Sequence, residues 1–182
     1  MAIQKRQRYT YHEWIEFCEN TMDSRSELID GELYMMASAS ARHQAVLGAM
    51  SARLHNYLRG KRCKTYFMLD VRLEKNTVLV PDLIVVCDPR RLTNHGCNGA
   101  PDFVVEILSP STASIDRHTK YKLYQQAGVP EYWMVDPVNN IVTVCRLVNG
   151  NYLSTILTET DTATITALPG FELNLSEVFT AE

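Results

Sequence analysis

Three charged residues, Asp82, Glu106 and Lys120, have the types that a hydrolytic site needs. Asp82 lies in the apolar run 81–86 and Glu106 interrupts the apolar run 103–108, so each carboxylate belongs to a predicted hydrophobic strand. A buried carboxylate requires a cation or hydrogen bonds. Two such carboxylates and a lysine predict a site that binds Mg²⁺, with Mn²⁺ as the alternative ion, and that hydrolyses phosphodiester bonds.

The chemistry assigns different work to the acids and to the lysine. A divalent cation held by the acids neutralises the phosphate and acidifies a water molecule, while a lysine stabilises developing negative charge or positions the nucleophile. Strand alternation puts Asp102 on the same face as Glu106, but four residues of strand separate them by about 13 Å. Asp102 is therefore predicted to lie too far away to share an ion with Glu106.

Each of these residues also has a structural alternative. Asp82 and Asp102 each follow a proline, where aspartate often begins a strand or a turn. For Glu106 the alternative is a structural salt bridge, which the cost of burying an ionised acid in an apolar strand disfavours. Asp116 precedes Lys120 by four residues, which favours an exposed ion pair on one helix face, and this pair can coexist with a catalytic role.

The elements that must position these residues follow from hydrophobic periodicity and from turn signals. Helices are predicted after a Thr10 and Glu13 capping box, over about 41–58, and over about 113–127. Strands are predicted for a hairpin over 27–36 that turns at Asp30-Gly31, and for 66–73, 81–86, 103–108, 131–137, 141–147, 152–157 and a terminal piece over 173–179. Residues 88–100 are predicted to form an exposed loop at the mouth of the site. We expect a single α/β or α+β domain over 1–182, with one mixed β-sheet flanked by helices.

Length and composition limit the classes of protein that this chain can be. Its 182 residues, 46% of them hydrophobic, suffice for one globular core. No run of about 18 apolar residues is present, so no membrane span is expected. The N-terminus lacks the apolar stretch of a signal peptide, and the five cysteines are scattered with no Cys-x-x-Cys spacing. These features predict a cytoplasmic protein without a disulfide framework or a zinc site.

The charge distribution gives only local support for nucleic-acid binding. The formal net charge of −3 creates no overall positive field. Basic residues gather at two places, which are Lys5, Arg6 and Arg8, and the larger cluster Arg53, Arg59, Lys61, Arg62 and Lys64. Ordinary solvated ends of helices are the alternative interpretation of both.

A combination of motifs resembles the Uma-type restriction endonuclease family over almost the whole chain. The matching positions are 27–32, His43, Pro81-Asp82, 105–112, Asp116 with Lys120 and Tyr124, and 128–137. This family belongs to the PD-(D/E)XK nuclease superfamily, so the resemblance implies a restriction-endonuclease-like fold with a four- to five-stranded mixed sheet flanked by helices. It also implies DNA as the substrate and Mg²⁺ as the cofactor. A homodimer is expected because many nucleases cut both strands of DNA as dimers.

The resemblance assigns a role to individual residues of the predicted site. Asp82 would be the first metal ligand, Glu106 the second, and the backbone carbonyl of Ile107 a further ligand. The superfamily pattern expects the lysine two residues after the second acid, and that position is Leu108 here. Lys120, on the following helix, is the matching lysine of the Uma-type pattern.

Four accessory residues complete the predicted site, each with an alternative. Lys122 competes with Lys120 but points about 200° away around the helix, so only one of them can serve well. Glu27 resembles an additional acid of some related nucleases, or else bonds to the backbone. His43 could polarise a phosphate or a water molecule, or else caps or packs a helix. Tyr124 either orients Lys120 or packs in the core.

Two functions from different classes follow from the sequence. The first is a metal-dependent DNA endonuclease that uses Asp82, Glu106 and Lys120. The second is a catalytically silent, nuclease-like module that binds nucleic acid or a protein, because Leu108 replaces the expected lysine and the sequence pI is about 6.0. Hydrolysis of another phosphate ester is a minor alternative, since the spacing of the acids does not identify the ester.

Overall fold

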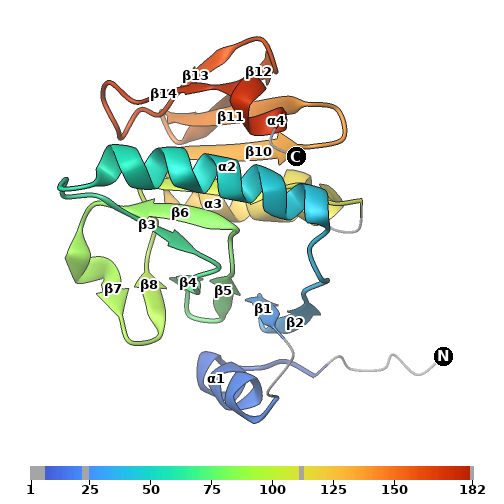
Figure 1. The fold of residues 1–182 in the computed structure, drawn as a ribbon. Helices are drawn as coiled ribbons and strands as arrows, with labels where there is room; N and C mark the ends of the chain where they lie inside the picture. Colours follow the sequence, from blue (N-terminus) through green and yellow to red (C-terminus); the bar gives the residue numbers. More distant parts are fainter. Residues whose placement is uncertain (1–6, 22–24, 111–112, 181–182) are drawn as a thin grey trace.

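The computed structural model describes residues 7–21, 25–110 and 113–180 and has an α+β fold (Figure 1). The main sheet has the strand order β12-β11-β10-β9-β6-β3. Its strands are β3 (Lys64–Phe67), β6 (Leu83–Val86), β9 (Phe103–Ile107), β10 (Glu131–Asp136), β11 (Ile141–Val148) and β12 (Asn151–Thr158). Only the pair β9 and β10 is parallel among these described strands, so the sheet is mixed.

A smaller sheet and a short two-stranded sheet accompany the main one. The smaller sheet, in the order β2-β1-β5-β4-β8-β7, consists of β1 (Ser26–Ile29), β2 (Glu32–Met35), β4 (Val71–Glu74), β5 (Thr77–Leu79), β7 (Leu92–Thr93) and β8 (Gly96–Asn98). The third sheet pairs β13 (Thr162–Thr164) with β14 (Glu172–Asn174). The helices are α1 (Tyr11–Asn20), α2 (Ala41–Leu58), the π-helical segment η2 (Ile115–Lys120), α3 (Tyr121–Ala127), α4 (Leu175–Phe179) and the short 3₁₀ turn η1 (Pro89–Arg91).

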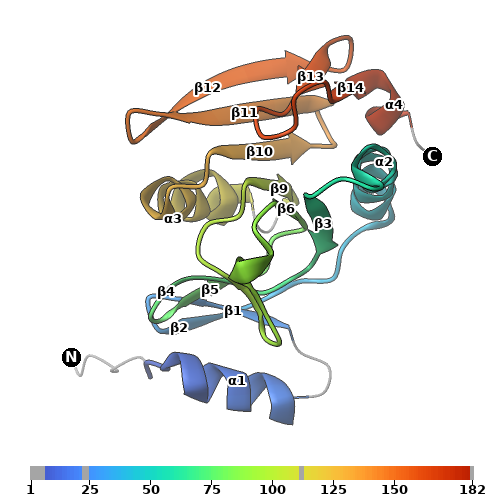
Figure 2. The ribbon, with the colours of Figure 1, turned by 90° about the vertical axis from the view of Figure 1, so that its left-hand side faces the viewer.

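Helices cover both faces of the main sheet, with α2 and α3 on opposite sides of it (Figure 2). On the α2 side, Met50 and Leu54 are buried in one cluster with Val105 and Trp133. On the other side, Tyr124 of α3 belongs to a second buried cluster that includes the strands of the smaller sheet. Alternate residues of β9 thus enter different clusters, and this alternation confirms the predicted faces of the 103–108 run.

Several predicted elements are confirmed. Thr10 and Glu13 form the expected capping box at the start of α1. The helix predicted over 41–58 is α2, and Ser40 caps it by accepting a hydrogen bond from the backbone N–H of His43 at 3.2 Å. The hairpin β1–β2 turns at Asp30 and Gly31, both of which have positive φ.

Other predictions were wrong in detail. The strand expected over 66–73 is two strands, β3 and β4, because Met68 has a φ of 49° and the chain turns from the main sheet into the smaller one. The terminal piece over 173–179 is divided between β14 and α4. There are three sheets in the described residues, where one was expected, and the main sheet has six strands, where the resemblance implied four or five. The single-domain organisation over 1–182 stays a prediction.

The expectation that the cysteines form no disulfide was also wrong. Cys63 and Cys87 are joined by a disulfide and are 24 positions apart in the sequence. They adjoin Lys64 and Val86, which face each other across β3 and β6, so strand pairing brings the two cysteines together. The helices of the described residues include none that is both long and apolar enough to cross a membrane.

Candidate active site

The predicted acids come together because their strands are neighbours. Leu83 of β6 is paired with Val105 of β9, so Asp82 and Glu106 lie at adjacent positions on the two strands. Both are buried, and both line one small cleft together with His43 and Lys120. The structure thus brings the two predicted metal ligands and the predicted lysine to the same place.

Asp82 is held by the neighbouring strand and by helix α2. Its Oδ2 accepts a hydrogen bond of 2.7 Å from the backbone N–H of Ile107 and lies 3.1 Å from Nε2 of His43. In an extended strand the N–H and C=O groups of one residue point to the same side, so the Ile107 carbonyl is directed toward the Asp82 edge. His43 therefore has two roles, since its backbone joins the helix cap and its side chain contacts an acid of the site.

Glu106 is connected to Lys120 and to Tyr124. Its Oε1 lies 2.9 Å from Lys120 Nζ and accepts a hydrogen bond of 2.9 Å from the Tyr124 hydroxyl. Tyr124 is fully buried and its ring lies 4.9 Å from the ring of Tyr132. Tyr124 thus packs in the core, as one alternative expected, but its hydroxyl orients Glu106 rather than Lys120.

Lys120 is surrounded by carboxylates. Besides Glu106, its Nζ lies 2.9 Å from Glu27 Oε1 and 3.3 Å from Asp116 Oδ1. Glu27 also accepts a hydrogen bond of 2.9 Å from the backbone N–H of Val80, which is the kind of backbone contact that the structural alternative predicted. The Asp116–Lys120 pair forms as expected, but it is buried rather than exposed.

The segment that carries Lys120 is wound more loosely than an α-helix. The prediction of a regular helix over 113–127 was incomplete, because Ile115–Lys120 is π-helical and α3 begins only at Tyr121. Such π-helical segments are often found at functional sites. Both Asp116 and Lys120 in this segment are buried, whereas Lys122 is exposed. Of the two candidate lysines, Lys120 is the one that reaches the acids.

The electrostatics of the site favour an added cation. Burial raises the pKa of Glu106 well above its ordinary value, since Lys120 only partly offsets burial and the nearby acids. Burial acts to lower the pKa of Lys120, but Glu106, Glu27 and Asp116 raise it well above its ordinary value. The lysine therefore keeps its proton, and a divalent cation bound beside Glu106 would favour the ionised form of that acid.

The donor groups of the site fit a hard divalent ion. The hydrogen bonds described above involve Oδ2 of Asp82 and Oε1 of Glu106, so each acid is already oriented through one of its two carboxyl oxygens. No group of three or more His, Cys, Asp or Glu side chains with metal-binding geometry exists among the described residues. Mg²⁺ is usually bound by one or two carboxylates and several water molecules, so two acids and a carbonyl are a suitable set.

Sequence reasoning missed two contacts of the site. Asp116 was considered only as an exposed partner of Lys120, although its spacing of four residues was the available signal. The ring of Tyr132 is buried in the core, and its hydroxyl donates a hydrogen bond of 3.2 Å to the backbone carbonyl of Asp116. No sequence pattern indicates that contact, because the two residues are on different elements.

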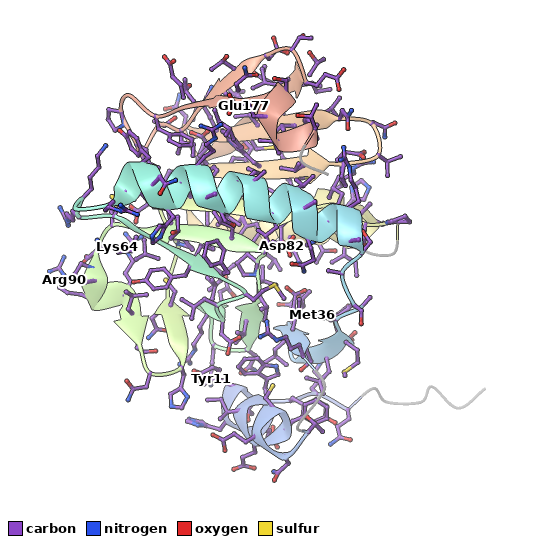
Figure 3. The ribbon with its side chains drawn as sticks, in the orientation of Figure 1. Tyr11, Met36, Lys64, Asp82, Arg90 and Glu177 are labelled. Atoms are coloured by element: carbon purple, nitrogen blue, oxygen red, sulfur yellow. A yellow bond between two sulfur atoms is a disulfide. The ribbon has the colours of Figure 1, made fainter. Side chains whose placement is uncertain are left out.

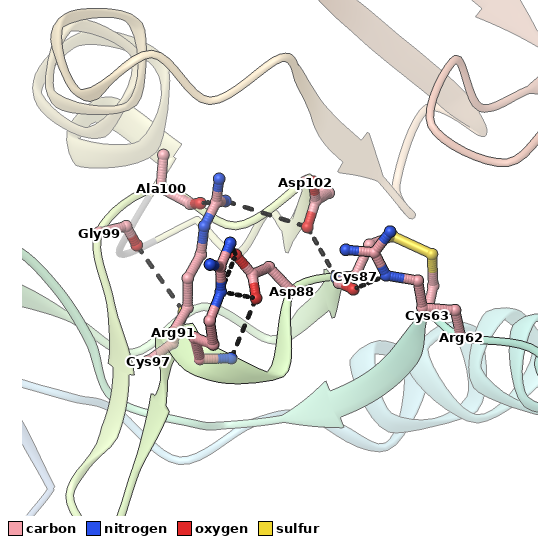
Figure 4. A network of polar contacts seen from close by, with 10 residues as sticks. Arg62, Cys63, Cys87, Asp88, Arg91, Cys97, Gly99, Ala100 and Asp102 are labelled. Carbon is pink, nitrogen blue, oxygen red and sulfur yellow. Dashed lines mark hydrogen bonds and ion pairs between the residues drawn. A yellow bond between two sulfur atoms is a disulfide. The ribbon is translucent and has the colours of Figure 1, made fainter.

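The segment 88–100 is not a loop at the mouth of the site, as predicted. It contains η1, β7 and β8, and none of the residues that line the cleft comes from it. Its polar network connects Asp88 with Arg90, and Arg91 with Asp102 at 3.9 Å (Figure 4). Asp102 also accepts a hydrogen bond of 2.7 Å from the Cys87 backbone N–H, so it has a structural role away from the site.

The larger basic cluster is partly engaged within the molecule. Arg53 forms an ion pair with Glu177, and Arg62 donates a hydrogen bond of 2.8 Å to the Cys87 carbonyl. Lys61 lies over the Tyr57 ring at 3.1 Å from its centroid. In the smaller cluster, Lys5 and Arg6 lie outside the described residues.

Comparisons with known proteins identify a family for this chain and a solved structure with the same fold. A family model described as "Putative restriction endonuclease" (Uma2) matches residues 9–176. Two proteins of Synechocystis sp., both described as uncharacterised, are 32% identical over 117 residues and 30% identical over 124 residues. These matches cover 63% and 65% of this chain, but 59% and 70% of the two relatives.

A solved structure shares the fold. The crystal structure of "a putative nuclease belonging to DUF820" from Anabaena variabilis superposes with a TM-score of 0.79, covering 94% of this chain and 97% of that chain. The sequence identity is 18%, so this likeness shows the fold alone. The family match extends over most of the chain, including every residue of the cleft. The chain therefore belongs to the Uma2 family of putative restriction endonucleases and has a nuclease-like fold.

Proposed function

We propose that this protein is a divalent-metal-dependent nuclease that hydrolyses phosphodiester bonds in DNA. The observation that carries the proposal is the convergence of Asp82, Glu106 and Lys120 in one cleft, with Lys120 Nζ 2.9 Å from Glu106. Asp82, Glu106 and the Ile107 carbonyl would hold Mg²⁺, or Mn²⁺ in its place. The family membership supports a nuclease-like function, and the chemistry of the acids supports the metal.

The residues of the chain have distinct tasks in this proposal. A bound divalent ion supplies an acidified water molecule and neutralises phosphate charge. Asp82 is oriented by the Ile107 N–H and by His43, and Glu106 by Tyr124 and Lys120, so the acids are held before an ion binds. Lys120 keeps its proton and contributes positive charge where negative charge develops on the phosphate.

A cleavage assay with matched aspartate variants tests the proposal. We expect the wild-type protein to cut plasmid or oligonucleotide DNA with Mg²⁺ or Mn²⁺ present, and Asp82→Asn to reduce the rate at least about a hundredfold, since loss of a ligand removes several kcal/mol of stabilisation. Asp102→Asn is the matched control, because Asp102 lies at the opposite end of the same pair of strands, beside Cys87, and outside the cleft. Equal cleavage by Asp82→Asn and the wild type would refute the proposal.

A second function, a catalytically silent binding module, has one observation in its favour. Lys120 is held by three carboxylates within 3.3 Å, and the position expected for the lysine of the superfamily is the buried Leu108. A lysine in such a cluster can stabilise the fold by compensating buried carboxylates without taking part in catalysis. Saturable binding of DNA or of a protein that is indifferent to divalent metal and to Asp82→Asn, together with no cleavage, would favour this function.

The cytoplasmic location and the homodimer belong to the same proposal. Two copies would supply one site for each strand of a duplex, which is the physical reason for expecting a dimer. The Cys63–Cys87 disulfide argues against the cytoplasmic location, because disulfides are uncommon in a reducing cytoplasm. Hydrolysis of a different phosphate ester stays a minor alternative.

A further inference from the structure

Two hollows follow one another between helix α2 and the edge strand β3, and we refer to them together as the α2–β3 groove. The first has a volume of about 510 Å³, and its lining includes His43, Gly48 and Ser51 of α2, Phe67 and Met68 at the end of β3, and Asp82. The second has a volume of about 350 Å³, and its lining includes His55 and Arg59 at the other end of α2, and Lys64 and Tyr66 of β3. A short connection joins the end of α2 to the start of β3, so the two elements run in opposite directions along the groove.

The groove opens into the proposed catalytic cleft. His43 and Asp82 line both the first hollow and the cleft, so the two spaces adjoin at the first predicted metal ligand. Figure 3 shows Asp82 and Lys64 on the same side of α2, with Lys64 near the C-terminal end of the helix and Asp82 nearer its N-terminal half. A chain lying in the groove would therefore extend from the basic end to the acid.

The middle of the groove has the surface that a nucleic-acid base requires. Phe67 is a large hydrophobic residue left 44% exposed. Across from it on α2, a Cβ atom added to Gly48 would meet no atom within 4 Å. An exposed aromatic ring beside open space permits a base to stack, and stacking on such a ring occurs with every base.

The charge of the groove is complementary to phosphate, although the whole chain is acidic. Arg25 lies at the catalytic end, and Arg59 and Lys64 lie at the other end, and all three are exposed. Neither Arg59 nor Lys64 forms an ion pair with another described residue. Asp82 is the single acid among the described residues that line the two hollows.

The dimensions fit a short single strand. The sixteen steps from His43 to Arg59 span about 24 Å along the helix, which corresponds to about seven stacked nucleotides at 3.4 Å each. A duplex hides its bases inside and offers phosphates outward, so a ring such as Phe67 can stack only on a strand whose bases are unpaired.

We propose that the α2–β3 groove binds one single-stranded segment of nucleic acid and leads it to Asp82. This inference rests on the proposed nuclease function and specifies its substrate.

Binding measurements separate this inference from catalysis. The probe is a fluorescein-labelled single-stranded DNA of eight nucleotides, followed by fluorescence anisotropy with Ca²⁺ in place of Mg²⁺, and compared with the same sequence as a duplex. We expect the single strand to bind more tightly. Phe67→Ala should weaken its binding about tenfold through the loss of stacking, and Phe67→Trp should retain it. Gly48→Gln, which fills the groove, should weaken it as much, whereas Gly48→Ala should not.

The salt dependence supplies a readout that a folding defect would not imitate. Lys64→Ala should lower the slope of log K against log salt by about one, because one phosphate contact is lost. Lys75→Ala is the matched control, since Lys75 is exposed in the turn between β4 and β5, and it should leave the slope unchanged. Thermal unfolding of each variant establishes that it is folded.

The outcomes distinguish the groove from the nuclease function. If folded Phe67→Ala and Gly48→Gln bind the strand as the wild type does while Asp82→Asn abolishes cleavage, the groove inference is wrong and the nuclease proposal stands. If both groove variants lose strand binding and no substrate is cleaved, the groove inference stands and the nuclease proposal fails. Tighter binding of the duplex, or a dimer that Phe67→Ala dissociates without altering strand binding, would also overturn the groove inference.

Discussion

Lys120→Ala is expected to destabilise the folded protein by about 3–5 kcal/mol at neutral pH and to abolish cleavage. The substitution leaves Glu27, Glu106 and Asp116 buried without the ammonium group that lies within 3.3 Å of each. Breaking a buried ion pair by removing one partner is costly because the remaining charge has no compensation. Denaturation in urea, with EDTA present to remove metal, measures this loss.

Lys122→Ala is the matched control for that experiment. Lys122 is two residues away on the adjoining helix and is exposed, so we expect its removal to change the free energy of unfolding by less than about 0.5 kcal/mol. Cleavage should also persist. Equal effects of the two substitutions would contradict the central position of Lys120, and a large effect of Lys122→Ala alone would transfer the catalytic role to Lys122.

Glu106→Gln is expected to have opposite effects on activity and on stability. The pKa of Glu106 is raised by burial in the folded protein, so the folded state holds its proton more tightly than the unfolded state. Such a group contributes stability that is present below the unfolded pKa, near 4.5, and is lost as pH rises through the folded pKa. The metal-free wild type should therefore become less stable as pH rises through this range.

The glutamine variant should lack this part of the pH dependence. Its amide oxygen can still accept hydrogen bonds from Tyr124 and Lys120, so at neutral pH without metal we expect it to be at least as stable as the wild type. Cleavage should fall at least about a hundredfold, since an anionic ligand is lost. Melting temperatures over a pH series, in EDTA and in Mg²⁺, measure both effects. An unchanged pH dependence in Glu106→Gln would show that Glu106 is ionised normally.

The sequence predicted those parts of the fold that depend on local signals. Helix α2 has a strong apolar period, and Asp30-Gly31 fixes a tight turn, so both were correctly located. The faces of β9 follow from alternation within one apolar strand. These features need no information about distant residues.

The missed features depend on contacts between distant segments. The turn at Met68 interrupts a run that alternates as one strand does, so its periodicity conceals the change from one sheet to the other. The Cys63–Cys87 disulfide requires the pairing of β3 with β6. The individual residues of the candidate site were predicted, but the cluster of carboxylates around Lys120 was not. Glu27, one of these carboxylates, comes from the β1–β2 hairpin, which is distant from Lys120 in the sequence.

The measurement that tests the account most directly is calorimetric titration of Mn²⁺ and Mg²⁺ into the wild type, Asp82→Asn, Glu106→Gln and the control Asp102→Asn, with short DNA present. Our account predicts metal binding in the wild type and in Asp102→Asn, and strongly reduced binding in each of the other two variants, because Asp82 and Glu106 share one ion. Equal heats in all four proteins, or no heat in any of them under conditions where DNA still binds, would contradict it.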